Sequence, residues 1–444
     1  MNYSQSLEYL LSFADFERSG RFQDRPDVAP VLALLRQLGD PHLGRRTVHI
    51  TGSKGKGSVA AMVESCLRAA GYSTGLFTSP HLHSYTERVR LNGEPIPEAV
   101  WARLTDTLRE AVDAVTPTLS DRRFVTFDLL IALAFLAFRE RDVDVQVLEV
   151  GLGGRVDSTN VFGPTEKDVC AFTAVGLEHT DILGDTVEAI AAEKAGIVTP
   201  GATVVIGPQS HPAARGVIAK AAAEAACPVV DVAQRYSWRY LAHDLHAQTF
   251  ELEGPDGAIR LTIPLLGRHQ MENAATAVAC LRALAERGVD IPLEAIENGL
   301  ARVSWPGRLE VLRERPLVIA DGAHSPESAA VLKGSLTDYF SCSSAFLIIG
   351  MLAGKDASAF ARELAPVARA VVTVAAGHPR AMPPEQVAIA FEEAGVQTKI
   401  GGSVGDTLEE VLAKTDSGEV ICVTGSLLVA AEARARLLGI ATTA

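Results

Sequence analysis

A glycine-rich turn between an apolar run and a helical run constrains this chain more than any other segment. Residues 51–58 read Thr-Gly-Ser-Lys-Gly-Lys-Gly-Ser and follow a β-branched run. Glycines let backbone N–H groups approach phosphate oxygens, and the N-terminus of the following helix adds partial positive charge. Lys56 can reach a β- or γ-phosphate, and the Ser58 hydroxyl can face Mg²⁺. We therefore predict a nucleotide-binding loop rather than a plain glycine-rich turn, although Gly57 departs from the usual GxxxxGK[ST] spacing.

Strand-like and helical runs alternate on both sides of this loop. Short β-branched runs alternate with longer runs rich in Ala, Leu and Glu, which is typical of a parallel sheet wrapped by helices. Residues 236–263 differ, because their alternating pattern around a Gly-Pro-Asp-Gly turn predicts antiparallel strands. The alternation restarts after the Trp-Pro-Gly at residues 305–307. We predict an α/β fold with two domains, residues 1–300 carrying the phosphate loop and residues 301–444 forming a smaller α/β domain.

Composition limits the partners of this chain. Its 444 residues carry a formal net charge of -13, which argues against nucleic acid as the main partner. The six cysteines are scattered without CxxC spacing, so buried thiols are expected rather than a zinc site or disulfides. The most apolar run, residues 129–138, is too short to span a bilayer. We expect a cytoplasmic protein that acts on small molecules, without a membrane or nucleic-acid partner, and as a monomer.

Acidic and basic candidates follow the predicted strands. Glu149 ends an apolar strand, where ligands bind in open α/β sheets, and it could hold Mg²⁺. His179 follows the next strand and could be a metal ligand, although a lone loop histidine is usually a surface residue. The local pattern gives Lys194 no special role beyond complementing the dipole at an exposed helix end. Asp321 and His324 follow the first strand of the second half, where they could face a cleft between the domains.

Several segments together resemble folylpolyglutamate synthase and dihydrofolate synthase, members of the Mur ligase superfamily. The phosphate loop is one of them, and the matches occur in the family's order over most of the chain. The other matching segments are residues 76–82, 87–93, 149–160, 193–197, 269–273, 305–310, 321–326 and 424–427.

The resemblance implies ATP bound between a nucleotide-binding domain and a smaller Rossmann-like domain. It also implies a carboxylate that is activated as an acyl phosphate and then joined to glutamate. The phosphates would be held by Gly55, Lys56, Gly57 and Ser58, and the remainder of the nucleotide by Asn273, Arg308 and Asp321. The magnesium positions would be Ser58, Ser79, Glu149 and His179.

Further roles also come from the resemblance alone. Lys194 matches a lysine that is carbamylated in the family, which would make it an anionic metal ligand. With Lys56, Asp321 and His324 it completes the implied catalytic set. The pterin part of the acid would contact Thr126, Phe127, Asp128, Val156, Asp157 and Ser158. His324 and Ser426 resemble positions near the incoming glutamate.

Departures from the family pattern bear on the substrate. The family usually has Thr-Asn where this chain has Ser53-Lys54, and Asn where it has Ser325. The family's Phe-Glu appears here as Phe127-Asp128, and residues 16–30 match poorly. Two alternatives therefore stay open: a Mur-superfamily ligase that acts on another acid, and a P-loop NTPase or small-molecule kinase.

Overall fold

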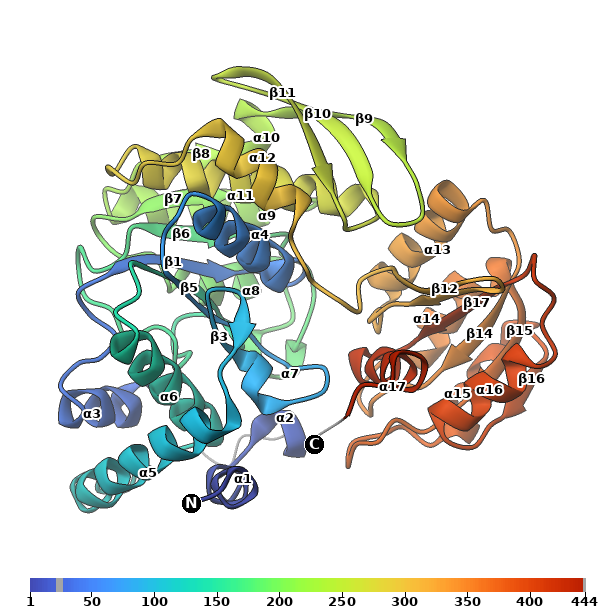
Figure 1. The fold of residues 1–444 in the computed structure, drawn as a ribbon, viewed down its shortest axis with the longest axis horizontal. Coiled ribbons are helices and arrows are strands. Elements are labelled where there is room, and N and C mark those ends of the chain that lie inside the picture. The colour runs from blue at the N-terminus through green and yellow to red at the C-terminus, as the bar shows by residue number, and fades with distance from the viewer. Residues whose placement is uncertain (21–26, 442–444) are drawn as a thin grey trace.

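The computed structural model describes residues 1–20 and 27–441, so residues 21–26 of the poorly matching N-terminal segment lie outside it. These residues form two lobes side by side (Figure 1). The larger lobe contains an eight-stranded sheet and a three-stranded sheet, and the smaller lobe contains a six-stranded sheet. The α/β fold with two parallel-rich sheets is confirmed.

The eight-stranded sheet positions the phosphate loop. Its strand order is β4-β3-β2-β5-β1-β6-β7-β8, and only β3 and β4 run antiparallel to their neighbours. Central strand β1 lies between β5 and β6, so the loop after β1 emerges beside the ends of both neighbours. The strands are β1 (Arg46–Thr51), β2 (Thr74–Phe77), β3 (Val89–Leu91), β4 (Glu94–Pro95), β5 (Val145–Glu149), β6 (Val169–Phe172), β7 (Thr203–Ile206) and β8 (Val229–Asp231).

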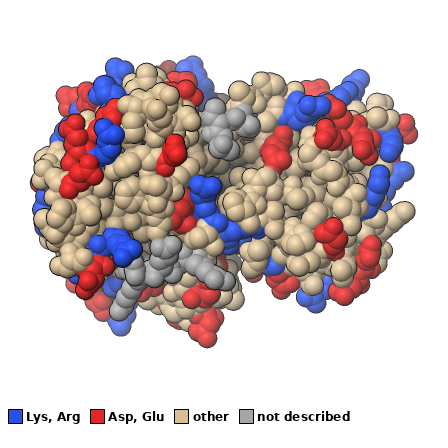
Figure 2. Space-filling model, turned by 90° about the horizontal axis from the view of Figure 1, so that it is seen from below, with Lys and Arg blue, Asp and Glu red and all other residues tan. Residues whose placement is uncertain are grey.

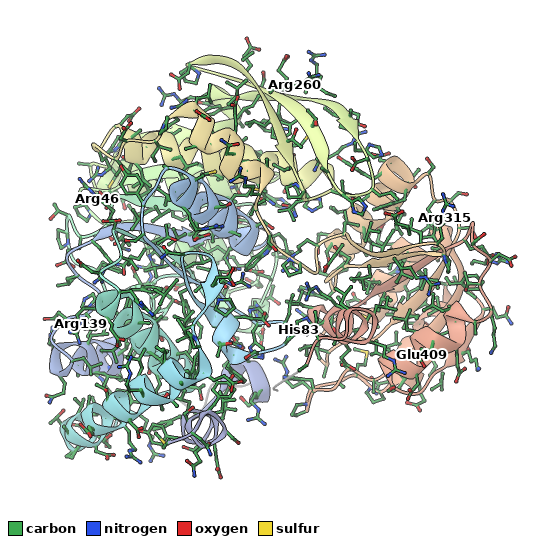
Figure 3. The ribbon with its side chains drawn as sticks, in the orientation of Figure 1. Arg46, His83, Arg139, Arg260, Arg315 and Glu409 are labelled. Carbon is green, nitrogen blue, oxygen red and sulfur yellow. The ribbon has the colours of Figure 1, made fainter. Side chains whose placement is uncertain are left out.

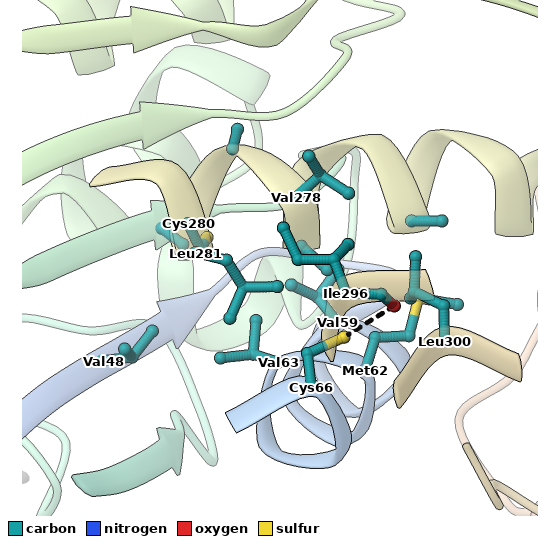
Figure 4. Packing of buried hydrophobic residues seen from close by; sticks show 14 of the residues in the cluster. Val48, Val59, Met62, Val63, Cys66, Val278, Cys280, Leu281, Ile296 and Leu300 are labelled. Carbon is teal, nitrogen blue, oxygen red and sulfur yellow. Dashed lines mark hydrogen bonds between the residues drawn. The ribbon is translucent and has the colours of Figure 1, made fainter. Parts of the chain in front are cut away.

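Helices cover both faces of this sheet. Alternate residues of β1 point to opposite faces, with Val48 and Ile50 on the side of α4, α11 and α12. Figure 4 shows this packing, in which the Cys66 thiol contacts the Ile296 carbonyl. Helices α3, α5 and α6 pack on the opposite face over β2 and β5, and α8 and α9 pack there over β6 and β7. All six cysteines are buried, as predicted.

The helices of the larger lobe have the following bounds: α1 (Tyr3–Leu11), α2 (Phe16–Ser19), α3 (Ala29–Gln37), α4 (Lys56–Ala69), α5 (Glu98–Val115), α6 (Thr126–Glu140), α7 (Thr180–Leu183), α8 (Val187–Ala195), α9 (Pro212–Glu224), α10 (Val232–Arg235), α11 (Arg268–Ala285) and α12 (Leu293–Ala301). Short 3₁₀ turns lie at Tyr85–Arg88 and Thr116–Thr118. Helix α6 is apolar almost all round because both of its faces are buried. None of the helices in residues 1–20 and 27–441 is both long and apolar enough to cross a bilayer.

The antiparallel segment is a three-stranded sheet, as its alternating pattern predicts. It consists of β9 (Ser237–His243), β10 (Gln248–Gly254) and β11 (Gly257–Ile263), in the order β11-β10-β9. The buried residues of β10 and β11 join the core that surrounds α4 and α11.

The smaller lobe has a mixed sheet in the order β12-β13-β17-β14-β15-β16. The edge strand β12 is antiparallel to β13, and the other pairs are parallel. Its strands are β12 (Glu310–Glu314), β13 (Leu317–Ala320), β14 (Ala345–Ile349), β15 (Ala368–Thr373), β16 (Thr398–Ile400) and β17 (Val420–Thr424). Its helices are α13 (Pro326–Phe340), α14 (Ala357–Leu364), α15 (Pro384–Glu393), α16 (Val404–Leu412) and α17 (Leu427–Leu438), with a 3₁₀ turn at Ala365–Val367.

Polar contacts join the two lobes. His83 of the larger lobe lies beside the smaller one (Figure 3), and Arg434 of α17 donates a 3.0 Å hydrogen bond to its Nε2. Arg434 also bonds Glu310 at the start of β12, at 2.9 Å. Arg434 therefore links the larger lobe to both α17 and β12 of the smaller lobe.

Candidate active site

The phosphate loop needs its glycines because other side chains press against it. Gly55 has a φ of 91°, and a Cβ there would lie 2.4 Å from Asn273 Oδ1. A Cβ at Gly57 would lie 2.5 Å from the Trp305 ring. The loop is further anchored where the Ser53 backbone N–H donates to the Ala174 carbonyl at 2.8 Å. The loop is thus closely packed between α11 and the segment that joins the lobes.

Lys56 and Ser58 begin helix α4. The Lys56 ammonium curls back over the loop and donates to the Gly52 carbonyl at 3.1 Å. Ser58 is buried in the first turn of the helix. Within the described part of the chain, no carboxylate forms an ion pair with Lys56. Its charge is therefore available for an anionic ligand at the helix N-terminus.

Glu149 lies beside the loop. It ends β5 and pairs in register with Ile50 of β1. The Ser79 backbone N–H donates to Glu149 Oε2 at 3.1 Å. Burial raises the pKa of Glu149 to about 6, although Lys56 and Arg308 oppose the rise. The buried Glu149 carboxylate offers hard oxygen donors at this strand end, which suit Mg²⁺.

His179 lies farther along the same edge of the sheet. It follows β6, has a φ of 47° and precedes α7. Burial lowers the pKa of His179 to about 4, so the ring is neutral and able to bind a cation. Across the residues that the structure describes, however, no group of three or more His, Cys, Asp or Glu side chains is arranged to hold a metal. Of the four implied magnesium positions, a hydrogen bond joins only Ser79 and Glu149.

Lys194 is buried, which corrects the interpretation of an exposed helix end. Its side chain is 1% exposed, and its ammonium donates to Glu178 Oε1 at 2.7 Å and to the Gly52 carbonyl at 2.9 Å. Burial alone would raise the pKa of Glu178, but Lys194 and Lys56 lower it to about 2. The local sequence does not predict this contact, because the contact depends on α8 packing against the phosphate loop.

Asp321 organises the connection between the lobes. Its carboxylate accepts hydrogen bonds from the backbone N–H groups of Leu309 at 3.0 Å and Ala323 at 2.8 Å. Burial raises the pKa of Asp321, and Arg308 opposes the rise. The Arg308 charge also acts on Glu149 of the other lobe. Arg308 therefore lies where it influences acidic groups on both sides of the cleft.

His324 faces the phosphate loop from the smaller lobe. Its Nδ1 lies 2.8 Å from the Gly322 carbonyl, which can only accept, so Nδ1 carries the proton. Its Nε2 then accepts a 3.3 Å hydrogen bond from the Lys54 ammonium. Burial, with Lys54 and Lys355 nearby, lowers the pKa of His324 to about 3.

Ser426 and the lining of the cleft complete this side. The Ser426 hydroxyl caps α17 by accepting from the Val429 N–H at 3.1 Å, and the Gly425 N–H donates to the Ala323 carbonyl at 3.0 Å. Ser426 therefore lies beside the loop that carries Asp321 and His324. A cleft is lined from both lobes by residues that include Gly57, Ser79, Glu149, Arg90, Arg308 and Leu427.

The residues implied for the acid substrate gather at the start of α6. Ser158 donates to Asp128 at 2.6 Å, and Phe127 packs against Gly151, where a Cβ would lie 2.6 Å from its ring. Asp157 accepts from the Leu152 N–H at 2.9 Å, which shapes the loop that also presents the exposed Val156. Thr126 instead bonds the backbone carbonyls of Leu10 and Phe13.

Three residues outside the expected set contact this site. Glu178 pairs with Lys194, Trp305 packs against Gly57, and Lys54 contacts His324. In the sequence, Lys54 stands out only because it gives the phosphate loop a second lysine. Nothing in the local sequence distinguishes the pairing of Glu178, because it depends on tertiary packing.

Comparisons with known proteins decide the family. The Mur ligase middle domain matches residues 50–281, and the Mur ligase glutamate ligase domain matches residues 307–427. The folylpolyglutamate synthase of Lacticaseibacillus casei is 36% identical over 99% of both chains. The chain belongs to the folylpolyglutamate synthase family of Mur ligases. As a member of this family, it is a ligase.

Solved structures of folylpolyglutamate synthases match over the same length. The Mycobacterium tuberculosis enzyme complexed with ADP has a TM-score of 0.90 and 31% identity, with full coverage of both chains. A folylpolyglutamate synthase complexed with the ATP analogue AMPPCP and folate has a TM-score of 0.82 and 34% identity. That match covers 99% of this chain and 100% of the other. The whole arrangement of both lobes is therefore that of the family.

Proposed function

We propose that this ligase uses ATP to join a folate-type carboxylate to L-glutamate through an acyl phosphate. The observation that carries the proposal is the meeting of three groups at one cleft. Gly57 of the phosphate loop lines this cleft with Glu149 and Arg308. Lys54 of the same loop contacts His324, and Asp321 lies within the influence of the Arg308 charge. Relatives with ADP, and with an ATP analogue and folate, support the choice of ligands.

The proposed nucleotide site uses both lobes. Gly55, Lys56, Gly57 and Ser58 would bind the phosphates through backbone N–H groups, the ammonium and the helix N-terminus. Asn273 is proposed to contact the nucleotide because it packs against Gly55. Arg308 and Asp321 would bind it from the connecting segment and the smaller lobe.

The chemistry explains why these residue types are needed. A carboxylate oxygen of the acid forms a bond to the γ-phosphorus while the bond to ADP breaks. Lys56 and Arg308 would offset negative charge on the transferring phosphoryl group. The glutamate amine then attacks the carbonyl carbon, phosphate leaves, and the nitrogen releases its proton to solvent. A cleft closed by two lobes would protect the acyl phosphate from water.

We propose Ser58, Ser79, Glu149 and His179 as the magnesium positions. Serine and carboxylate oxygens suit this ion, and a cation would offset the burial that raises the pKa of Glu149. Magnesium supplies charge neutralisation for the phosphates when it is bound.

Carbamylation of Lys194 is a further part of the proposal. The reaction needs a neutral amine, and burial lowers the pKa of Lys194. A carbamate would be an anion beside Glu178, so it would require a cation between the two groups. Intact-mass measurement under bicarbonate tests this directly. The addition of one carbon dioxide per chain, which K194R lacks, supports carbamylation. The absence of any added mass in the unmodified protein opposes it.

The acid and the amine are proposed to approach from different lobes. Thr126, Phe127, Asp128, Val156, Asp157 and Ser158 would form the pterin side in the larger lobe. His324 and Ser426 would lie near glutamate in the smaller lobe. We also propose residues 1–300 and 301–444 as the two domains, and a monomer as the working unit.

An omission experiment tests the function. Purified protein is supplied with ATP, magnesium, L-glutamate and either dihydropteroate or a reduced folate, and the products are identified by mass spectrometry. The expected result is an amide product and phosphate release that both require the acid and the amine. Phosphate release without an acid, or a phosphorylated small molecule as the end product, would instead favour an NTPase or a kinase.

A further inference from the structure

Lys54 is the second lysine of the phosphate loop, and its side chain reaches the other lobe. Its ammonium donates to His324 Nε2 at 3.3 Å, whereas Lys56 turns back to the Gly52 carbonyl at 3.1 Å. The side chains of the two loop lysines therefore point in different directions. Lys56 stays over the phosphate cradle, and Lys54 faces the smaller lobe.

Lys54 has acidic neighbours, Glu178 and Glu327, but no direct ion pair to either of them among the described residues. Among the described residues, no carboxylate forms an ion pair with Lys54, Lys56 or Lys355, and Glu178 Oε1 already binds Lys194. Burial lowers the pKa of Lys54 to about 8; the charge of Glu178 opposes this shift, and the positive charges of Lys355 and Lys56 add to it. Figure 2 shows Lys and Arg side chains gathered in the furrow between the two lobes. In a chain of net charge -13, this local excess of positive charge suits an anionic ligand.

An ammonium has three N–H donors, and Lys54 uses one of them on His324. Within the described residues, no other acceptor lies at hydrogen-bonding distance from its Nζ. The remaining donors are available for oxygens in the cleft. The residues that face Lys54 from the other side, His324 and Lys355, belong to the segment matched by the glutamate ligase domain.

We propose that Lys54 binds a carboxylate of the incoming L-glutamate from the phosphate-loop side, and so favours an anionic amine substrate over a neutral one. The inference rests on the proposed ligase function. It assigns the extra lysine to the amine substrate rather than to ATP. Replacement of the family's usual asparagine by Lys54 would thus add one cationic contact to the glutamate site.

The test compares two amines that use the same acyl phosphate. L-Glutamate is anionic, whereas hydroxylamine is small and neutral and traps the acyl phosphate as a hydroxamate. For Lys54→Asn, which introduces the family's usual residue, we expect the KM for glutamate to rise at least tenfold. We expect the hydroxamate rate to fall by a much smaller factor. Lys54→Arg keeps the charge and should recover most of the affinity for glutamate.

Three outcomes are distinguishable. A KM for glutamate that is unchanged in Lys54→Asn overturns the inference. A rise in the KM for ATP, with equal losses in both reactions, also overturns it and places Lys54 in the nucleotide site. Failure of the unmodified enzyme to form any hydroxamate counts against the proposed function itself. Lys220→Asn is the matched control, because the Lys220 side chain is 77% exposed on α9 and should leave both reactions unchanged.

Discussion

Ser158 Oγ donates a 2.6 Å hydrogen bond to Asp128 Oδ1, and both side chains are buried. The other oxygen of Asp128 accepts from the Val125 N–H at 3.0 Å. Burial nevertheless raises the pKa of Asp128 to about 7, because these bonds only partly offset the cost of a buried charge. The hydrogen bond between Ser158 and Asp128 joins the loop after β5 to the start of α6. The protonation state of the Asp128 carboxyl changes near neutral pH.

This pair predicts a pH-dependent stability. The folded pKa of Asp128 lies above its unfolded value, so its contribution is complete below about pH 4 and is lost as the pH rises through 7. Between pH 5 and pH 8 the unmodified protein should lose roughly 2–3 kcal/mol that Asp128→Asn does not lose. Urea unfolding of both proteins at the two pH values measures the difference. Parallel losses in the two proteins would contradict the assignment.

Gly57→Ala should impair the site through a steric clash rather than through backbone strain. The added Cβ would lie 2.5 Å from the Trp305 ring, so the phosphate loop and the connecting segment must separate. We expect kcat/KM for ATP to fall at least tenfold, as measured in a coupled ADP assay. Gly216→Ala is the matched control, because a Cβ there meets no atom within 4 Å. Equal activities of the two variants would show that the contact with Trp305 is not needed.

Lys194→Ala should lose activity by roughly two orders of magnitude, and short carboxylates such as formate should restore part of it. The expectation follows from the proposed carbamate, whose negative end would be replaced by an added anion. Rates measured across formate and methylamine concentrations separate two cases. Rescue by methylamine alone would show that Lys194 acts as the ammonium that pairs with Glu178.

Asp321→Ala should weaken the use of ATP although Asp321 lies in the smaller lobe. Without its carboxylate, the N–H groups of Leu309 and Ala323 lose their acceptor, and Arg308 loses a neighbouring negative charge. We expect the KM for ATP to rise several-fold in steady-state kinetics. An unchanged KM and kcat would mean that the two lobes do not share the nucleotide.

Periodicity predicted most of the fold, because both parallel sheets have β-branched strands separated by helices. The pattern predicted the alternation of strands and helices in both lobes and the antiparallel segment between them, and all three are observed. It missed the antiparallel strands β3 and β4 and the edge strand β12, because these strands are mostly half-buried or exposed and contain charged residues or proline instead of an apolar run.

The site was less visible in the sequence. The strand-end positions of Glu149, Asp321 and His324 could be predicted, because ligands bind at the carboxyl ends of parallel strands. The burial of Lys194 could not, because it depends on where α8 packs. The contact between Lys54 and His324 joins residues that are 270 positions apart, so only the closure of the two lobes creates it.

In the proposed reaction, a carboxylate of the acid takes the terminal phosphoryl group of ATP. The most direct measurement uses an acid substrate whose carboxyl oxygens carry a heavy isotope, with ATP, magnesium and L-glutamate, and mass spectrometry of the released phosphate. Each released phosphate should carry one labelled oxygen, and Lys56→Ala should abolish this transfer of the label. Unlabelled phosphate formed together with the amide product would contradict it.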